Sequence, residues 1–100
     1  MIVKGGYIYI ISNYTRTVLY TGVTSDLFNR IYEHKNGIGS AFTSKYQCKY
    51  LLHFEFFETI EEAITREKNI KKWKREWKIN LIKEKNPTLS DLSDAIEDYR

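Results

Sequence analysis

Glu67 lies where the sequence predicts the buried face of a helix. Apolar residues recur at helical spacing after Thr59, and Glu67 comes three residues after Ile64 and three before Ile70. A carboxylate on a core-facing stripe loses its hydration unless another group pairs with it. The partner is either an inward Arg or Lys, which is the commoner case, or a divalent metal ion such as the Mg²⁺ that serves phosphates. Glu67 is therefore the first candidate for chemistry.

Arg30 and His34 form a second candidate group. They are four residues apart in a predicted helix that Thr24 or Ser25 caps and Gly37 ends, so they share one helix face. A guanidinium can direct two N–H groups at phosphate oxygens, and a histidine can carry a proton near neutral pH. The alternatives are an arginine that only extends from the core edge and a histidine that is simply on the surface.

Two tyrosines are predicted to face each other across a β-hairpin. Strands are expected at residues 7–12 and about 18–23, and a loop over Asn13 to Arg16 would place Tyr9 directly opposite Tyr20. Such a pair is either sheet packing or part of an active site. A free phenol titrates near pH 10, so a tyrosine base would need a nearby cation or hydrogen bond to favour its phenolate.

Each of these signals is weak alone, but together they supply what phosphodiester hydrolysis requires. The tyrosines or the histidine can accept a proton, Arg30 can stabilise the charge of the transition state, and Glu67 can hold a metal ion. The combination predicts a hydrolase of phosphodiester bonds.

The remaining pattern defines the elements that must position these groups. A third strand is expected at residues 50–57, with Tyr50, Leu52, Phe54 and Phe56 on one face and Leu51, His53, Glu55 and Phe57 on the other. Thr59 and Glu62 form a capping box that opens a long helix, bent near its middle and stopped by Pro87. The loop before the third strand is expected to hold at most a short helical turn.

Composition indicates one small domain. The chain has 100 residues, of which 42% are apolar, and it contains no run long enough to span a membrane. Cys48 is the single cysteine, so an internal disulfide is excluded and no zinc cluster is indicated. A cytoplasmic protein, most simply a monomer without a small-molecule cofactor, is expected, and an unidentified protein partner stays open.

Charge is distributed unevenly along the chain. Residues 66–85 contain nine Lys or Arg against three Glu, a net charge of +6, whereas the segment from about residue 90 to 100 is acidic. A basic segment within a folded domain indicates either a nucleic-acid partner or a solvated helix face. Two tryptophans, Trp73 and Trp77, lie among its lysines. The residues expected to contact nucleic acid are Arg66, Lys71, Lys74, Arg75 and Lys78.

The order and spacing of these motifs resemble the GIY-YIG nuclease superfamily. The motif residues are "YIY" at 7–9, "YTG" at 20–22, Arg30, Glu67 and Asn86. The stretch "EEAITREKNIKKWKREWKINLI", followed by "NP", resembles the small stand-alone bacterial branch, which is similar to the N-terminal nuclease module of the UvrC repair protein. The resemblance covers about residues 4–92. The tyrosine motifs depart mildly from GIY and YIG, and Val23 and Thr24 stand where the repair nucleases tend to have a lysine.

The resemblance implies an α+β fold, with a three-stranded antiparallel sheet flanked by helices. It also implies one Mg²⁺ or Mn²⁺ ion on Glu67, with Arg30 stabilising the pentacoordinate phosphate. One tyrosine would act as general base; Tyr20 is preferred and Tyr9 would support it. Asn86 would brace the site, and His34 would lie at its edge.

The function that follows is a metal-dependent DNA endonuclease acting on duplex or branched DNA, as in repair or recombination. Two alternatives stay open at this point. The same fold can serve as a nucleic-acid-binding accessory module with little turnover, and the charged helix can be the solvated surface of a small structural protein. Salt-sensitive retention on a polyanion column separates the last alternative from the first two.

Overall fold

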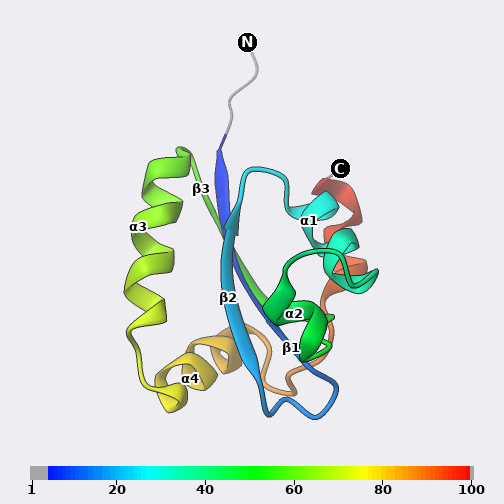
Figure 1. Cartoon of the computed structure of the whole chain (residues 1–100). Helices are drawn as coiled ribbons and strands as arrows, with labels where there is room; N and C mark the ends of the chain where they lie inside the picture. The colour runs from blue at the N-terminus through cyan, green and yellow to red at the C-terminus, as the bar shows by residue number, and fades with distance from the viewer. Residues whose placement is uncertain (1–4, 100) are drawn as a thin grey trace.

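The computed structural model describes residues 5–99 and contains a three-stranded antiparallel sheet between two layers of helices (Figure 1). The strands are β1 (Gly6–Ser12), β2 (Leu19–Thr24) and β3 (Tyr50–Phe57), in the spatial order β2-β1-β3. Central β1 is covered on both faces, so its residues 8–12 are all buried. None of them is charged, which suits a strand buried on both sides. The predicted α+β fold is confirmed.

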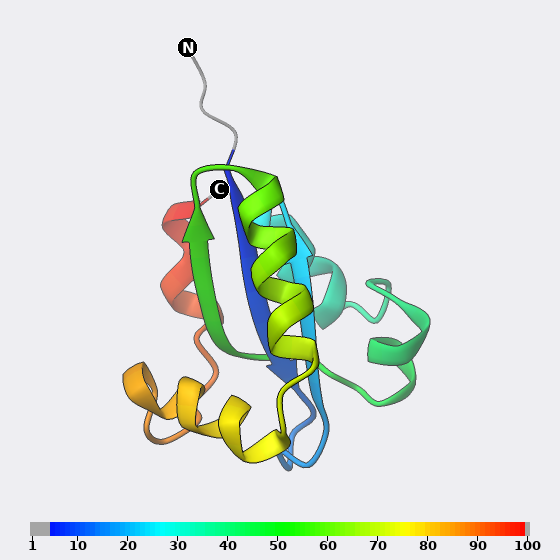
Figure 2. The ribbon, with the colours of Figure 1, turned by 90° about the vertical axis from the view of Figure 1, so that its left-hand side faces the viewer.

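Within residues 5–99, four α-helices and one 3₁₀ helix surround the sheet. They are α1 (Leu27–Lys35), α2 (Ala41–Lys45), α3 (Ile60–Lys71), α4 (Arg75–Lys85) and the 3₁₀ helix η1 (Ser93–Tyr99). Helix α3 covers one face, and α1 and α2 lie on the other, while α4 crosses below the end of α3 (Figures 1 and 2). No helix within residues 5–99 combines the length and the apolar character that a membrane crossing requires.

The starts of α1 and α3 are both set by local capping hydrogen bonds, of which only that of α3 was predicted. The capping box of α3 forms as predicted: the Thr59 hydroxyl accepts from the Glu62 N–H at 3.2 Å and donates to the Glu62 carboxylate at 2.9 Å. Helix α1 is capped instead by Asp26, whose carboxylate accepts from the Asn29 N–H. The predicted cap at Thr24 or Ser25 is wrong because the Thr24 hydroxyl bonds the Asp26 backbone.

The hairpin register differs from the prediction by two residues. Ser12 pairs with Leu19, not Thr17, and Tyr9 pairs with Gly22, so Tyr9 is not directly opposite Tyr20. The loop is longer because Asn13 organises it: the side-chain oxygen of Asn13 accepts from two backbone N–H groups, those of residues 17 and 18. A shift of two residues preserves the face, so both tyrosines still point to the α1 side as diagonal neighbours.

A bulge opposite Ile10 and Ile11 changes the predicted faces of β3. Leu52 packs into the apolar core beneath α3 and α4, whereas Phe54 packs into the core beneath α1. The prediction that Tyr50, Leu52, Phe54 and Phe56 share one face is therefore wrong. The cause is the extra residue at the bulge, which interrupts the alternation that an unbroken strand would have.

The acidic C-terminal segment is part of the packed structure. The Leu92 N–H donates to the Leu51 carbonyl at 2.7 Å, and the Asp91 carboxylate accepts from the Leu51 N–H at 3.0 Å, so this segment covers the outer edge of β3. Ile96 is 1% exposed and belongs to the core beneath α1. The core thus continues beyond the predicted limit near residue 92.

Candidate active site

Tyr9 and His34 form a buried hydrogen-bonded pair. The Tyr9 hydroxyl Oη lies 2.9 Å from His34 Nε2, and the two side chains are 1% and 2% exposed. Tyr9 comes from central strand β1 and His34 from the last turn of α1, the helix that covers this face. The histidine expected at the edge of the site lies inside it, as the direct partner of a motif tyrosine.

The hydrogen-bond chain continues from His34 to helix α2. His34 Nδ1 lies 3.0 Å from the Thr43 hydroxyl, which in turn donates to the Ser40 carbonyl at 3.3 Å. With the Thr43 proton directed at Ser40, Nδ1–H donates to Thr43, and Nε2 accepts from the Tyr9 hydroxyl; we assign the tautomer from this chain. The sequence analysis missed Ser40 and Thr43, whose only local signal is the capping pattern of a short helix.

Two glycines make room for this pair. A Cβ at Gly22 would lie 2.4 Å from the Tyr9 hydroxyl oxygen, so the Tyr9 phenol lies directly over the β2 backbone only because residue 22 has no side chain. A Cβ at Gly39 would lie 2.1 Å from His34 Nδ1. The glycine of "YTG" is thus explained by the space that the partner tyrosine occupies rather than by a turn.

The electrostatics keep both members of the pair neutral near pH 7. Burial raises the pKa of Tyr9 to about 12, although the nearby charge of Arg30 acts in the opposite direction. Burial also lowers the pKa of His34 to about 4, and the charge of Arg30 adds to that effect. Near pH 7 the phenol therefore holds its proton, and the imidazole is unprotonated at Nε2, where it accepts the hydrogen bond from Tyr9.

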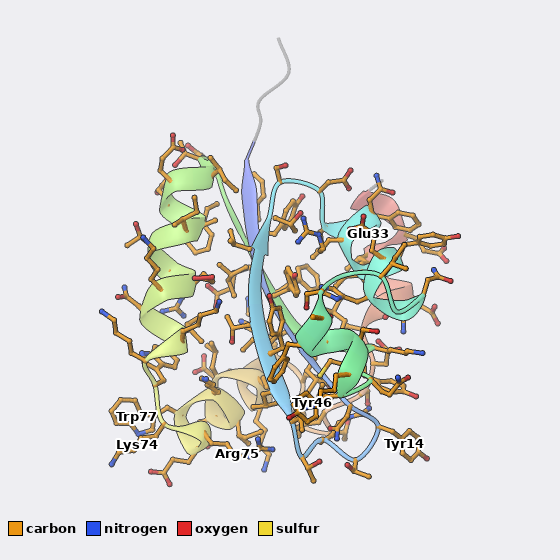
Figure 3. All side chains as sticks on the ribbon, in the orientation of Figure 1. Tyr14, Glu33, Tyr46, Lys74, Arg75 and Trp77 are labelled. Atoms are coloured by element: carbon orange, nitrogen blue, oxygen red, sulfur yellow. The ribbon has the colours of Figure 1, made fainter. Side chains whose placement is uncertain are left out.

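Arg30 lies at the rim of this pair, one helical turn before His34. Its side chain is 40% exposed, and its Nε lies 3.2 Å from the carboxylate of Glu33, an (i, i+3) ion pair on α1; Figure 3 labels Glu33 on that helix. Exposed pairs of this kind contribute little to stability. The charge of Arg30 affects the pKa values of Tyr9 and His34. Because its side chain is exposed and its ion pair is weak, the guanidinium can also turn toward an incoming anion.

Tyr20 completes the aromatic wall of the site without joining the hydrogen-bond chain. Its ring centroid lies 6.5 Å from that of Tyr9 and 6.0 Å from that of His34. Within residues 5–99 its hydroxyl has no hydrogen-bond partner, and its ring is stacked on Phe42 at 5.7 Å. The two motif tyrosines thus differ: Tyr9 is hydrogen-bonded to His34, whereas Tyr20 makes only ring contacts.

Glu67 projects inward from α3, as its place in the apolar stripe predicts, and is 9% exposed. Its carboxylate lies 3.1 Å from Lys71 Nζ one turn later, so the common explanation, a lysine partner, holds for the unbound protein. The same ammonium lies 5.7 Å from the centre of the Tyr20 ring. Because β2 is an edge strand, this lysine links the α3 side of the sheet to the tyrosine wall on the other side.

The single carboxylate of Glu67 suits a metal ion that keeps most of its coordinated water molecules. The part of the chain that the structure describes contains no group of three His, Cys, Asp or Glu side chains able to hold a metal. Mg²⁺ in phosphate chemistry often uses one or two carboxylates, with water and substrate oxygens filling its other positions. On β2, a strand that α3 contacts, the Thr21 hydroxyl is buried and has no hydrogen-bond partner. The residues therefore fit a metal anchored by one carboxylate.

Asn86 is held by backbone groups and lies apart from the Tyr9–His34 pair. Its side-chain N–H group donates to the Leu52 carbonyl at 3.0 Å and to the Ser90 carbonyl at 2.9 Å. Its side-chain oxygen accepts from the Ser90 N–H at 3.1 Å. Asn86 thereby fastens the end of α4 to β3, and no contact between it and Tyr9, Arg30 or Glu67 occurs among residues 5–99.

The basic segment is only partly available to a ligand. Arg66 lies between the Glu55 carboxylate, at 3.0 Å, and the face of Trp73, at 5.2 Å. Arg75 donates to the Arg16 carbonyl and so ties the start of α4 to the hairpin loop. In the described chain Lys78 has no ion-pair partner, and an exposed Lys74 lies over the Trp77 ring (Figure 3).

The tryptophans form their own hollow beside α4. Trp77 is half exposed, and its ring meets that of Trp73 edge-on at 6.4 Å. A cavity of about 380 Å³ is lined by these rings together with Asn80, Leu81 and Glu84. None of these residues belongs to the Tyr9–His34 pair, so this hollow is separate from the candidate active site.

Comparison with known proteins places this geometry in a family. A family model described as the GIY-YIG catalytic domain matches residues 5–80. That range includes Tyr9, Tyr20, Arg30 and Glu67 but not Asn86. A UPF0213 protein of Clostridium perfringens is 42% identical over 80 residues, covering 80% of this chain and 85% of that protein. A UPF0213 protein of Haloquadratum walsbyi is 40% identical over 78 residues, covering 78% of this chain and 86% of that protein.

A solved structure extends the comparison to the fold. The solution NMR structure of a UPF0213 protein from Bacillus halodurans matches with a TM-score of 0.56 and 26% identity, and the match covers 96% of this chain and 99% of that one. The names of these relatives state no activity, whereas the catalytic domain itself suggests a nuclease. The chain belongs to the GIY-YIG catalytic domain family and, by its similarity over most of its length, to the UPF0213 proteins within it.

Proposed function

We propose that the protein is a divalent-metal-dependent endonuclease that hydrolyses phosphodiester bonds in DNA, with branched or damaged DNA as its class of substrate. The observation that carries this proposal is the neutral chain from Tyr9 through His34 to Thr43 with Arg30 at its rim. A binding module has no need of a buried phenol hydrogen-bonded to a proton acceptor, at a place where any charge that forms loses its hydration.

The chain provides a path for the proton of an attacking water. The Tyr9 oxygen accepts that proton as its own proton passes to Nε2 of His34, so no free phenolate has to exist at neutral pH. This assigns the general base to Tyr9 rather than to Tyr20, which sequence reasoning preferred. Tyr9 has a proton acceptor at 2.9 Å, whereas Tyr20 has none among the described residues.

Arg30 has two functions in this scheme. Its guanidinium can release Glu33 and donate two N–H groups to the oxygens of the reacting phosphate. The phosphate charge then offsets the effect of Arg30 on the imidazole, so His34 can hold the arriving proton more readily than in the unbound protein. Substrate binding and proton acceptance are thereby coupled through one side chain.

Members of the GIY-YIG family typically use a divalent metal, and we place one Mg²⁺ or Mn²⁺ ion at Glu67. When bound, such an ion supplies Lewis-acid charge for the developing negative charge on the phosphate and leaving oxygen. Lys71 has to leave the carboxylate for this, and its side chain is 48% exposed, so it can turn into solvent or toward a neighbouring phosphate.

The experiment that tests the proposal is a cleavage assay with Mg²⁺ or Mn²⁺ on single-stranded, duplex, flap and junction DNA. We expect metal-dependent cleavage of at least one substrate by the wild-type protein and none by Glu67→Ala. Binding without cleavage of any of the four by the wild-type protein would contradict the proposal and leave the accessory binding module.

A matched variant excludes misfolding as the cause of lost cleavage. Glu67→Gln removes the charge and keeps the shape, and it leaves behind only a lysine that is half exposed. We therefore expect cleavage to be abolished and the melting temperature without metal to change little. A large drop in melting temperature, with cleavage by the folded fraction unchanged, would make Glu67 a structural residue.

A further inference from the structure

An aromatic surface continues outward from the Tyr9–His34 pair along helix α2. The Tyr20 ring is stacked on Phe42 with an interplanar angle of 30°, and Phe42 lies 4.7 Å from Tyr46. Phe42 and Tyr46 are 43% and 41% exposed. Figure 3 shows Tyr46 on the same side of β2 as α1 and α2. A row of rings thus leads from the catalytic groups to solvent.

The orientation of α2 is set by the hydrogen-bond chain and not by burial of these rings. Thr43 is the buried residue of this helix; it bonds His34, and its carbonyl accepts from the Cys48 N–H at 2.9 Å. The helix would bury more apolar surface if Phe42 turned inward, and that burial would be favourable. Holding Thr43 on His34 instead presents Phe42 to solvent in a fixed position beside the site.

Positive charge lies at both ends of this surface. Lys45 Nζ is 5.3 Å from the centre of the Tyr46 ring, and Lys71 Nζ is 5.7 Å from that of Tyr20. Exposed aromatic faces between lysines are the arrangement by which proteins bind unpaired nucleotides, because the ring stacks on a base while the ammonium groups attract the flanking phosphates. A docked protein segment would account for the apolar rings but not for the lysine placed over each end.

We propose that Phe42 and Tyr46 form a nucleobase-stacking subsite that takes one unpaired base next to the phosphate that reacts. The inference rests on the proposed nuclease function and names a feature of its substrate. A base inside a duplex already stacks on its neighbours and has no free face for Phe42. The subsite therefore selects DNA in which the nucleotide beside the scissile phosphate is unpaired, as in a single strand, a flap or a frayed junction.

The test measures binding in a background that cannot cleave. Glu67→Gln protein without divalent metal is titrated with short single-stranded oligonucleotides, one with all its bases and a series in which each member lacks one base. Phe42→Ala is expected to weaken binding to the intact strand about 5- to 100-fold, and Phe42→Trp to retain it. Phe56→Ala is the matched control, because this ring is 55% exposed but contacts Tyr7 and lies outside the row.

The abasic series decides whether the ring contacts a base. At one position, removing the base should weaken binding by the parent protein about as much as Phe42→Ala weakens binding to the intact strand. The Phe42→Ala variant should then lose little further affinity when that base is removed. A fully paired duplex should show no loss with Phe42→Ala. Equal losses on every abasic strand, or a loss no larger than that of Phe56→Ala, would overturn the subsite and leave the row as a contact for a protein.

The two proposals fail in different ways. If the wild-type protein cleaves DNA but Phe42→Ala binds and cleaves like wild type, the subsite is wrong and the nuclease assignment stands. If neither the wild-type protein nor the Glu67→Gln background acts on or binds any of the DNA forms, the nuclease assignment fails and the subsite fails with it. Circular dichroism melts of each variant show that the molecules compared are folded.

Discussion

On the α1 face of the sheet the tyrosine–histidine pair is neutral, whereas on the α3 face the carboxylate of Glu55 is ionised and paired. Tyr9 and His34 have pKa values of about 12 and about 4, both moved by burial away from charging at pH 7. On the other face, burial alone would raise the pKa of Glu55, but hydrogen bonds from His53 and Arg66 lower it to about 2.

Under the proposed function, this difference favours the α1 face for the proton transfer. A carboxylate that is fully paired with Arg66 and His53 stabilises one structure and has no proton to move near neutral pH. A neutral phenol hydrogen-bonded to a neutral imidazole can take a proton from water as its own proton passes to the imidazole, which leaves a neutral phenol and an imidazolium whose charge a bound phosphate would offset. The α3 face contributes to the site through Glu67, whose lysine partner is exposed enough to be displaced.

The largest expected effect separates the two tyrosines. Tyr9→Phe removes the hydroxyl that bonds His34 and should lower kcat by about 10²- to 10⁴-fold, the usual size of general acid–base catalysis. Tyr20→Phe keeps the stacked ring and should lower kcat by less than about tenfold. Single-turnover cleavage of one DNA substrate by both variants measures the difference, and the reverse order would return the base to Tyr20.

Acid unfolding should show the two faces in different pH windows. The pKa of His34 is about 4 in the folded protein and 6.5 in the unfolded chain, so between these values the unfolded chain binds more protons. Stability therefore falls as the pH drops from 6.5 to 4. Glu55 has a folded pKa of about 2 against 4.5 unfolded, so its stabilisation is present above 4.5 and is lost as pH falls toward 2.

Urea unfolding at a series of pH values measures both windows. Glu55→Gln should lower stability at pH 7 by about 2–3 kcal/mol and flatten the curve between pH 4.5 and 2. His34→Asn should flatten the curve between pH 6.5 and 4 and leave the lower window in place. An unchanged slope in either window would show that the corresponding group is not the one that titrates there.

Gly22→Ala should disturb the catalytic face by about 1–3 kcal/mol, the usual cost of inserting a methyl group into a packed site. The new Cβ would meet the Tyr9 phenol, so cleavage should fall together with stability. Gly37→Ala is the control: its φ of +74° makes alanine strained, but the nearest atom to its Cβ would be the Ser44 hydroxyl oxygen at an ordinary 3.8 Å, and its N–H would still bond the His34 carbonyl. That variant should lose about 1 kcal/mol of stability and keep its activity per folded molecule.

The smallest expected effect concerns the basic residues of α3 and α4. Lys74→Ala should weaken DNA binding by a few-fold and reduce the slope of log affinity against log salt by about 1, the value for one lost phosphate contact. Arg66→Lys should leave the slope unchanged, because Arg66 is already paired with Glu55 and stacked on Trp73. Equal slopes for wild type and Lys74→Ala would remove Lys74 from the contact surface.

The features of the site that follow from local sequence patterns were predicted better than those that depend on contacts between distant residues. The inward position of Glu67, the common face of Arg30 and His34 and the capping box at Thr59 all follow from helical spacing, and the structure contains each of them. The hairpin register was missed because the Asn13 side chain holds a longer loop, and the faces of β3 were missed because of a bulge. Neither feature has a periodic signal.

The sequence by itself determined the kinds of groups in the site and the face of each element on which they lie, because side-chain direction follows the 2.0 and 3.6 residue periods of the backbone. Tertiary structure decided their partners. His34 bonds Tyr9 and Thr43, which are 25 and 9 residues away in the chain, and Arg66 is neutralised by Glu55 on another element. Such contacts depend on how helices pack on the sheet, and a distance set by packing leaves no mark in local spacing.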